Sequence, residues 1–178
     1  KVERRLLLVV LILVFSIGNL LVALSSHYYT ILAARLIIAF AHALFWSISI
    51  SLATRVAPYG RFSYGLSVVS AGVTFALVLG MPLGKYIGDT WGWSSTFFSI
   101  SAASFIVMVV IRFALPKLPS VNAGSLKTLP ETLRNKSLIA AYCVVSLFVT
   151  GNYTAYTYIV PFLTNISGLN ENASTLLL

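Results

Sequence analysis

Long apolar stretches recur five times along the chain. They cover residues 6–24, 30–54, 62–84, 93–111 and 137–160, and only the second contains a charged residue, Arg35. A helix needs about 20 apolar residues to cross ~30 Å of hydrocarbon. Each stretch is long enough, so the pattern predicts five membrane-spanning helices. The fifth is expected to end at Pro161, because proline lacks a backbone N–H and its ring disfavours further helix.

The longest polar stretch, residues 116–136, separates the fourth predicted helix from the fifth. It holds three prolines together with Gly, Ser, Asn and several lysines, a composition typical of loops. The chain is therefore predicted to divide into four helices over residues 1–115, a linker over 116–136, and a second group over 137–178. That second group holds one helix and, from residue 173, the start of another.

The overall composition excludes a soluble domain. Of the 178 residues, 58% are hydrophobic and 9% are charged, against roughly 45–50% and 25% in soluble domains. No polar domain follows the first apolar stretch, so that stretch is not a cleaved secretory signal. The prediction is an all-α membrane protein, a polytopic helical bundle in contact with the lipid bilayer.

The charge balance indicates orientation rather than nucleic-acid binding. The chain has twelve basic and four acidic residues, a net charge of +8, but the basic residues lie between apolar stretches and not on one solvated face. Ten of them fall in alternate loops, which the positive-inside rule places on the cytoplasmic side. These ten are Lys1, Arg4, Arg5, Arg55, Arg61, Arg112, Lys117, Lys127, Arg134 and Lys136. The chain is thus expected to start in the cytoplasm and end outside.

One face of the second predicted helix carries Arg35, Ala39, His42, Trp46 and Ser49, at spacings of three and four residues. An ionisable residue within a span marks a functional site by default, and histidine titrates near neutral pH. Arg35 and His42 are therefore candidates for a proton pathway, and Trp46 for a substrate pathway. Two structural alternatives stay open: Arg35 snorkels to the interface, or His42 is a neutral hydrogen-bonding partner of a neighbouring helix.

None of the five apolar stretches contains a carboxylate. Arg35 thus lacks an acidic partner within the predicted spans, and a proton-coupled carrier generally needs an intramembrane acid or a substitute for one. If transport is coupled to protons, the main proton site is expected to lie off this chain.

Small residues recur every four positions in the third predicted helix, at Gly72, Ala76, Gly80 and Gly84. Such a face lets another helix approach closely. Pro82 is expected to interrupt this helix, and interrupted helices are found at the moving seams of carriers. The prediction is a gating or helix-packing role for these residues, and a static tight crossing is the alternative.

The fifth predicted helix carries a polar stripe. Tyr142, Ser146, Thr150, Tyr153 and Thr157 share one face, and Asn152 and Tyr156 form an adjacent row. Hydroxyl, amide and aromatic groups together are suited to an uncharged, sugar-like substrate. A substrate pathway is therefore predicted along Tyr142, Asn152, Tyr153 and Tyr156. The alternative is that these side chains join helices and anchor the outer interface.

The sequence contains no motif for catalysis, phosphate binding or metal binding. The single cysteine, Cys143, excludes an intramolecular disulfide and a multi-cysteine metal site. We therefore expect no enzyme activity, no cofactor and no metal.

Six short segments in a fixed order resemble the major facilitator superfamily and, within it, the bacterial sugar efflux transporters of the SotB type. They are Val-Glu-Arg-Arg-Leu-Leu at 2–7, Ala-Phe-Ala-His-Ala-Leu-Phe-Trp-Ser-Ile at 39–48, Val-Leu-Gly-Met-Pro-Leu-Gly-Lys at 78–85, Gly-Trp at 92–93, Gly-Ser-Leu-Lys-Thr-Leu-Pro at 124–130 and Tyr-Thr-Ala-Tyr-Thr-Tyr-Ile at 153–159. The resemblance covers nearly the whole chain.

The resemblance implies a fold of twelve helices in two six-helix halves that are joined by a cytoplasmic loop. The five predicted helices then look like the third to the seventh, so two would precede Lys1 and five would follow Leu178. Residues 116–136 look like the loop between the halves.

The resemblance also implies roles for single residues. Arg4 and Arg5 match the end of a basic loop motif that latches the cytoplasmic side, although Glu3 stands where glycine is usual. Arg35 matches an arginine implicated in proton coupling. An antiporter motif is matched in part by Gly72, Gly80, Pro82 and Gly84, although Gly-Met-Pro-Leu-Gly departs from the commoner Gly-Pro-x-x-Gly-Gly. Ser94 stands where relatives often have arginine.

The expected function is export of sugars or sugar analogues of the arabinose, lactose or thiogalactoside type across the bacterial inner membrane. The expected mechanism is exchange for protons with alternating access. One alternative is an exporter of drugs or other small metabolites. The other is a truncated membrane fragment without transport function.

Overall fold

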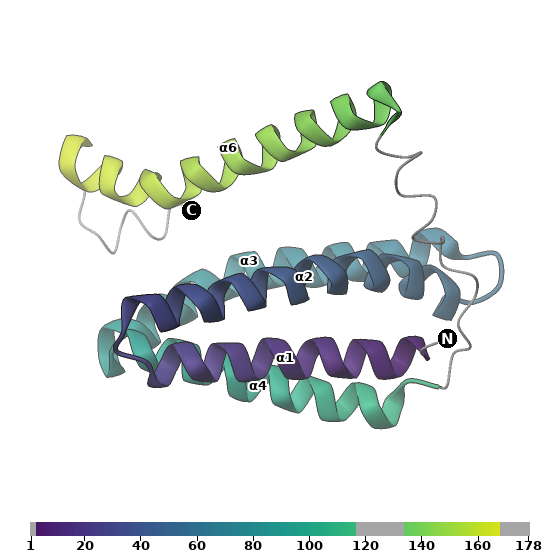
Figure 1. Ribbon diagram of the computed structural model, residues 1–178, viewed down its shortest axis with the longest axis horizontal. Coiled ribbons are helices and arrows are strands. Elements are labelled where there is room, and N and C mark those ends of the chain that lie inside the picture. Colours follow the sequence, from purple (N-terminus) through teal and green to yellow (C-terminus); the bar gives the residue numbers. More distant parts are fainter. Residues whose placement is uncertain (1–2, 117–133, 168–178) are drawn as a thin grey trace. The chain divides into compact units, whose positions relative to one another are not determined.

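A computed structural model describes residues 3–116 and 134–167. These ranges contain five helices: α1 (Arg4–Leu24), α2 (Tyr28–Val56), α3 (Phe62–Trp91), α4 (Trp93–Ala114) and α6 (Lys136–Ser167) (Figure 1). Each contains a segment that is long and apolar enough to cross a membrane. The predicted all-α fold with five candidate spans is confirmed. Most of the predicted linker and the predicted helix start at residue 173 lie outside the described residues.

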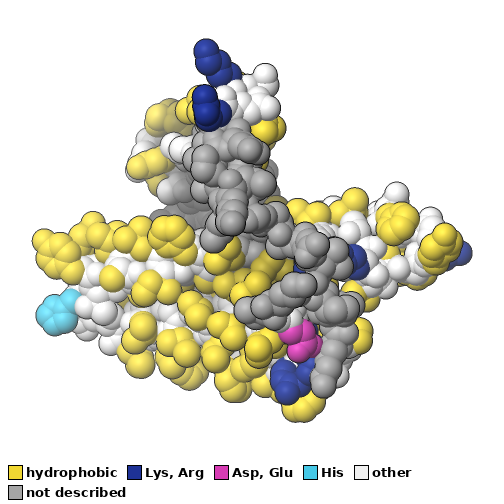
Figure 2. Space-filling view, turned by 45° about the vertical axis from the view of Figure 1, so that its right-hand side comes forward, with side chains coloured by type: hydrophobic (Ala, Val, Ile, Leu, Met, Phe, Trp, Pro, Cys, Tyr) yellow, Lys and Arg dark blue, Asp and Glu magenta, His cyan; other side chains and the backbone are white. Residues whose placement is uncertain are grey.

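The chain divides into two compact units, Lys1–Ser120 and Val121–Leu178. The first contains α1 to α4, which run antiparallel to their neighbours along the chain (Figure 1), and the second contains α6. Figure 2 shows hydrophobic side chains over the flanks of the helices and basic side chains near helix ends. Such a surface is suited to lipid along the flanks and to water or headgroups at the ends.

Helix α1 is the centre of the first unit. It packs against α2 and α4, and it contributes eight of the buried residues, whereas α3 contributes none in the described chain. Val22 of α1 packs with Ala34 and Ile38 of α2 in a buried cluster, and Phe97 of α4 closes this cluster from the other side. The helices of the first unit are therefore assembled around α1.

Two of the connections depend on glycines with positive φ. Gly92 (φ +87°) is the single residue between α3 and α4, and Gly60 (φ +79°) lies in the turn between α2 and α3. Glycine has no Cβ and adopts this conformation without the steric penalty of other residues. Gly92 thereby allows the chain to reverse direction within one residue.

Two predicted helix ends are wrong. Helix α3 continues seven residues beyond Gly84 to Trp91, with Pro82 inside it, and α6 continues through Pro161 to Ser167. A proline removes one N–H donor, but backbone groups in lipid have no water as an alternative partner, which favours continued helix on both sides. The i,i+4 ion pair of Lys85 with Asp89 adds local support to the end of α3. Pro82 therefore does not unwind α3.

Two buried serines join α1 to α4. The Ser16 hydroxyl donates to the Ser101 carbonyl oxygen at 2.9 Å, and the Ser101 hydroxyl donates to the Ser16 carbonyl oxygen at 2.8 Å. Near one end of the same two helices, the Ser94 hydroxyl of α4 donates to the Ala23 carbonyl oxygen of α1. Hydroxyl groups of this kind hold helices together in lipid, where the hydrophobic effect does not.

We expect Ser101→Ala to lower the free energy of unfolding by about 1 kcal/mol, the scale of an interhelical hydrogen bond in a membrane. The measurement is reversible unfolding of the chain in mixed micelles, followed by circular dichroism. Ser104→Ala is the matched control, because the Ser104 hydroxyl donates to Ile100 of its own helix. Equal losses in the two variants would contradict the role given to the serine pair.

Candidate functional site

The Arg35 guanidinium lies over an aromatic ring. Its Cζ atom is 4.5 Å from the centre of the Phe97 ring of α4, and the Phe97 ring in turn meets Trp93 edge to face at 5.9 Å. A cation over a ring face is stabilised by roughly 0.5–2 kcal/mol, with more at desolvated sites. Arg35 is the eighth residue of α2 and is exposed, so its N–H groups are accessible from outside the four-helix unit.

His42 and Trp46, one turn apart on α2, are joined by a hydrogen bond. The indole Nε1–H of Trp46 donates to Nε2 of His42 at 2.7 Å, and the two ring planes are inclined to each other by 29°. On its other side, His42 meets the Phe15 ring of α1 edge to face at 5.9 Å. The predicted shared face of His42 and Trp46 therefore contains a direct contact between them.

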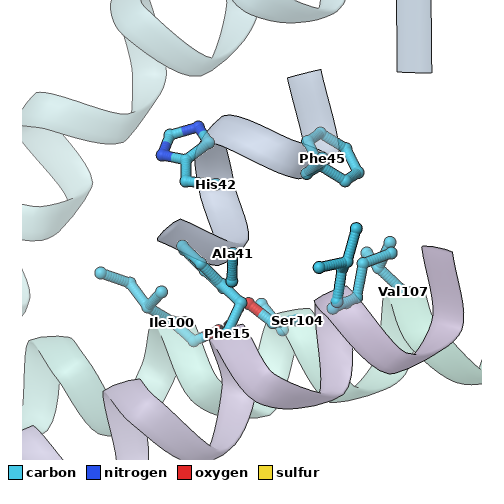
Figure 3. Close-up of a pocket in the computed structure, with 10 residues that line it drawn as sticks. Phe15, Ala41, His42, Phe45, Ile100, Ser104 and Val107 are labelled. Carbon is cyan, nitrogen blue, oxygen red and sulfur yellow. Dashed lines mark hydrogen bonds between the residues drawn. The ribbon is translucent and has the colours of Figure 1, made fainter. Parts of the chain in front are cut away.

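A cavity of about 340 Å³ opens beside His42, between α1, α2 and α4. Figure 3 shows His42 and Phe45 from α2 on one side, with Phe15 of α1 and Ser104 of α4 on the other. Its lining is apolar except for two side chains, His42 and Ser104. The volume falls in the range of small-molecule sites, which are mostly apolar with a few polar groups.

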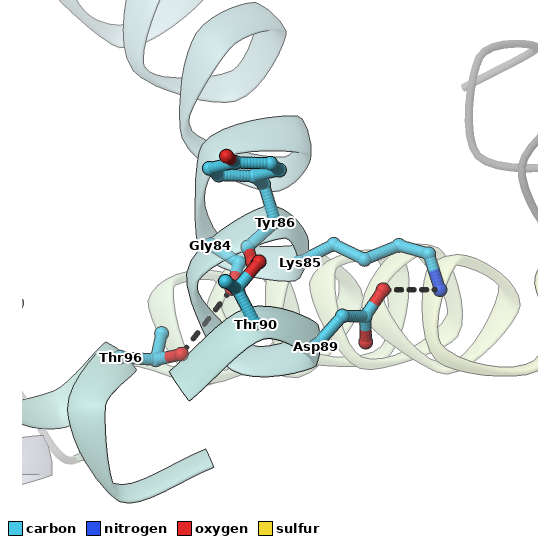
Figure 4. A network of polar contacts seen from close by, with 6 residues as sticks. All are labelled: Gly84, Lys85, Tyr86, Asp89, Thr90 and Thr96. Carbon is cyan, nitrogen blue, oxygen red and sulfur yellow. Dashed lines mark hydrogen bonds and ion pairs between the residues drawn. The ribbon is translucent and has the colours of Figure 1, made fainter. Parts of the chain in front are cut away.

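A carboxylate lies inside a candidate span, which corrects the expectation that none does. Asp89 is in the last turn of α3, where its Oδ2 is 3.5 Å from Lys85 Nζ (Figure 4). The expectation failed because the predicted helix ended at Gly84, short of both residues. The Asp89 side chain is largely exposed, as expected for a residue at the end of a 30-residue helix, about 45 Å long.

Within the described residues, the glycines of the small-residue face of α3 are open at Gly72 and Gly80 and meet α4 at Gly84. A Cβ added to Gly72 or Gly80 would have no heavy atom within 4 Å, and one added to Gly84 would meet only Thr96 at 3.8 Å. Thr96 also donates a hydrogen bond to the Gly84 carbonyl oxygen at 3.2 Å (Figure 4). The predicted packing or gating role of Gly72, Gly80, Pro82 and Gly84 stays a prediction.

Arg4 and Arg5 tie the start of α1 to the ends of two other helices. Arg4 Nη1 donates to Ser51 Oγ of α2 at 2.9 Å, and Arg5 Nη1 donates to the carbonyl oxygen of Leu115, which follows α4, also at 2.9 Å. Both arginines thus bind groups on the same end of the first unit. A polar clamp at one end of a helical unit is consistent with the latch that the resemblance implies.

The polar stripe of α6 belongs to the second unit. Tyr142, Asn152, Tyr153 and Tyr156 are all exposed, and the Thr154 and Thr157 hydroxyls donate to carbonyl oxygens one turn earlier. The tyrosine and asparagine side chains are therefore available to a ligand or to another helix. Their predicted place in a substrate pathway stays a prediction.

The Major Facilitator Superfamily model matches residues 1–178, the entire chain. The chain belongs to the Major Facilitator Superfamily. Its members are secondary transporters and not enzymes, which confirms the predicted class of activity and the multi-pass arrangement in a lipid bilayer. The superfamily assignment leaves the substrate open, since one fold supports many specificities.

The sequence did not predict which residues of neighbouring helices contact the candidate residues. Phe97 under Arg35, Phe15 beside His42, and Ser51 at Arg4 come from other helices. Their spacing along the chain carries no periodic signal, so only a three-dimensional arrangement identifies them. In the described part of the chain, no group of three or more metal-binding side chains occurs.

Proposed function

We propose that this transporter exports sugars or sugar analogues of the arabinose, lactose or thiogalactoside type. The observation that carries the proposal is the polar face of α6, where exposed tyrosines stand beside Asn152 over two helical turns. Amide and hydroxyl groups match the donor and acceptor pattern of a sugar, and aromatic faces cover its C–H surface. A helix that faced only lipid would have no use for this stripe.

Export is proposed to proceed in exchange for protons, by alternating access in the bacterial inner membrane. Residues 1–115 form part of one half of the carrier, residues 137–178 begin the other, and residues 116–136 connect them on the cytoplasmic side. Support comes from Arg35 and His42, two ionisable side chains within one span, and from the alternation of basic loops. Rocking of the halves about a midplane site is the general mechanism for such folds.

A second candidate function is export of drugs or other small metabolites. The observation in its favour is the cavity beside His42, in which eight of the ten lining residues are apolar. A sugar does not match such a lining, because its hydroxyl groups would lose hydrogen bonds with water there. The two candidates therefore predict different cargoes and different sensitive residues.

Cells that express the intact carrier are expected to accumulate less labelled arabinose, lactose or thiogalactoside than cells with an empty vector. Asn152→Leu removes the amide at similar volume, and we expect it to abolish most of this difference. Val144→Leu, outside the polar stripe of α6, is the matched control and is expected to export normally. A protonophore is expected to abolish export by the unchanged carrier and by the Val144→Leu variant.

Equal accumulation in carrier and vector cells would overturn the sugar proposal. Extrusion of an apolar dye by the same cells would then favour the second candidate, with Phe45→Ala at the cavity as its sensitive variant. If neither cargo is exported, the proposed transport function of this chain is wrong.

A further inference from the structure

The direction of the hydrogen bond between Trp46 and His42 fixes the protonation of the histidine. An indole N–H can only donate, so Nε2 of His42 must be the acceptor in the 2.7 Å contact. A ring nitrogen accepts only when it carries no proton. His42 is therefore neutral in this structure and carries its hydrogen on Nδ1. Protonation at Nε2 would put two N–H groups against each other at hydrogen-bonding distance.

In the described part of the chain, the residues that line the cavity together with His42 carry no charge. The cavity residues that α1 and α4 contribute are apolar apart from Ser104, whose hydroxyl is bound to Ile100. On α2, the charged residue closest to His42 along the chain is Arg35, two turns or ~10 Å along the helix. The other charged or titratable groups of the four helices are Arg4 and Arg5 on α1, Tyr28, Tyr29 and Arg55 on α2, Tyr64, Lys85, Tyr86 and Asp89 on α3, and Arg112 on α4.

Each of these groups lies toward a helix end. Arg4 and Arg5 bind Ser51 and Leu115, and Asp89 pairs with Lys85 in the last turns of α3. The indole of Trp46 is therefore the group in direct polar contact with the titrating nitrogen of His42. A change in the charge of His42 acts first on Trp46.

We propose that Trp46 is a positioning residue that converts protonation of His42 into a side-chain movement. With His42 neutral, the hydrogen bond holds the indole along the face of α2. When Nε2 binds a proton, its lone pair forms the new N–H bond and the Trp46 N–H loses its acceptor. The indole then moves away from the imidazole ring of His42. Loss of the proton restores the acceptor and the hydrogen bond. As a device for proton-coupled transport, the pair rests on the proposed function, but its chemistry is testable without transport.

Histidine is the side chain that generally changes charge between about pH 5 and pH 8. The emission wavelength of an indole depends on the polarity around its N–H, so release of the Trp46 N–H from His42 changes the emission wavelength of Trp46. The other tryptophans, Trp91 and Trp93, are at the junction of α3 and α4. Replacing both with phenylalanine leaves Trp46 as the single tryptophan of the chain, which has three.

The experiment is a fluorescence titration of this single-tryptophan chain in lipid nanodiscs between pH 8 and pH 5. We expect the emission maximum of Trp46 to shift with one proton's steepness between these pH values and to return to its starting wavelength at pH 8. In a His42→Gln background the titration is expected to vanish, since the glutamine carbonyl accepts the indole N–H but binds no proton. His27→Gln, which removes the only other histidine, is the matched control and is expected to leave the titration intact. Circular dichroism at both pH values confirms that each variant is folded.

A flat titration in the single-tryptophan chain overturns the proposal, and so does a titration that survives His42→Gln. The titration contains no substrate, so its outcome is independent of sugar export. A reversible titration that depends on His42 supports the pair even if the intact carrier exports no sugar, a result that would overturn only the proposed function.

Discussion

Under the proposed exchange for protons, Arg35→Ala is expected to lower efflux by the carrier about tenfold or more, which corresponds to ~1.4 kcal/mol or more, because Arg35 is an ionisable residue within a candidate span. The guanidinium lies on the Phe97 ring with its Cζ atom 4.5 Å from the ring centre. That contact holds the charge at a fixed place within α2 while leaving its donors accessible. Efflux into inverted membrane vesicles, driven by an imposed pH gradient, measures the effect.

Three further variants separate the possible reasons for a loss. Arg35→Lys keeps the charge but not the planar group that stacks on the ring, so we expect intermediate efflux. Phe97→Leu removes the ring and keeps an apolar side chain, and we expect it to resemble Arg35→Lys. Arg61→Ala is the matched control, because Arg61 is an exposed arginine in the turn between α2 and α3. Unchanged efflux in Arg35→Ala would contradict a role of Arg35 in proton coupling. It would favour the alternative in which Arg35 snorkels to the interface.

The sequence was sufficient to predict the five helices because a membrane makes the signal strong. Each span needs a long uncharged run, and backbone groups in lipid must be paired within the helix. Helix ends are harder, since the local rule that proline ends a helix competes with this pairing requirement. At Pro82 and Pro161 the pairing requirement prevailed, and both residues lie inside helices. Asp89 fell outside the predicted helix for a different reason, because the uncharged stretch ends at Gly84, directly before Lys85.

Contacts within one helix followed from periodicity, whereas contacts between helices did not. The spacing of four residues placed His42 and Trp46 on one face, and they form a hydrogen bond. Phe97, by contrast, is 62 residues after Arg35 in the chain, and nothing in the local sequence of either residue points to the other. Ser16 and Ser101 illustrate the same limit, because a serine in an apolar helix looks alike whether it binds its own helix or a neighbour.

The glycines of α3 show that periodicity alone does not predict where two helices pack closely. The regular spacing of Gly72, Gly80 and Gly84 predicted a close helix crossing, yet among the described residues Gly72 and Gly80 face open space. The close approach of α2 and α3 is at Gly65 instead. There, an added Cβ would overlap the Ala53 carbonyl oxygen and would lie 3.0 Å from the carbonyl carbon. Spacing identifies a helix face without bulky side chains, but only the packing shows which position on that face a neighbouring helix contacts.

Gly65→Ala is therefore expected to destabilise the four-helix unit by about 1–3 kcal/mol, the usual penalty for overpacking. The obstacle is the backbone of α2, which cannot rotate away as a side chain can, so α3 must shift as a whole. This penalty is a net value. Alanine is up to ~1 kcal/mol more favourable than glycine within a helix, and that gain offsets part of the cost of overpacking. Reversible unfolding in mixed micelles measures the loss, and disulfide cross-linking between cysteines introduced at the ends of α2 and α3 measures their separation.

Gly72→Ala provides the matched control, since it makes the same chemical change on the same helix, seven residues away. With no heavy atom within 4 Å of its new Cβ among the described residues, only the helix preference acts, and we expect this variant to be as stable as the parent or up to ~1 kcal/mol more stable. Gly18→Ala should fall between the two, because its Cβ would meet Ile38 Cγ1 at 2.6 Å and a side chain can move aside. Equal stability of the Gly65 and Gly72 variants would contradict the packing of α3 on α2. A loss confined to Gly72→Ala would instead place another helix on the open face of α3.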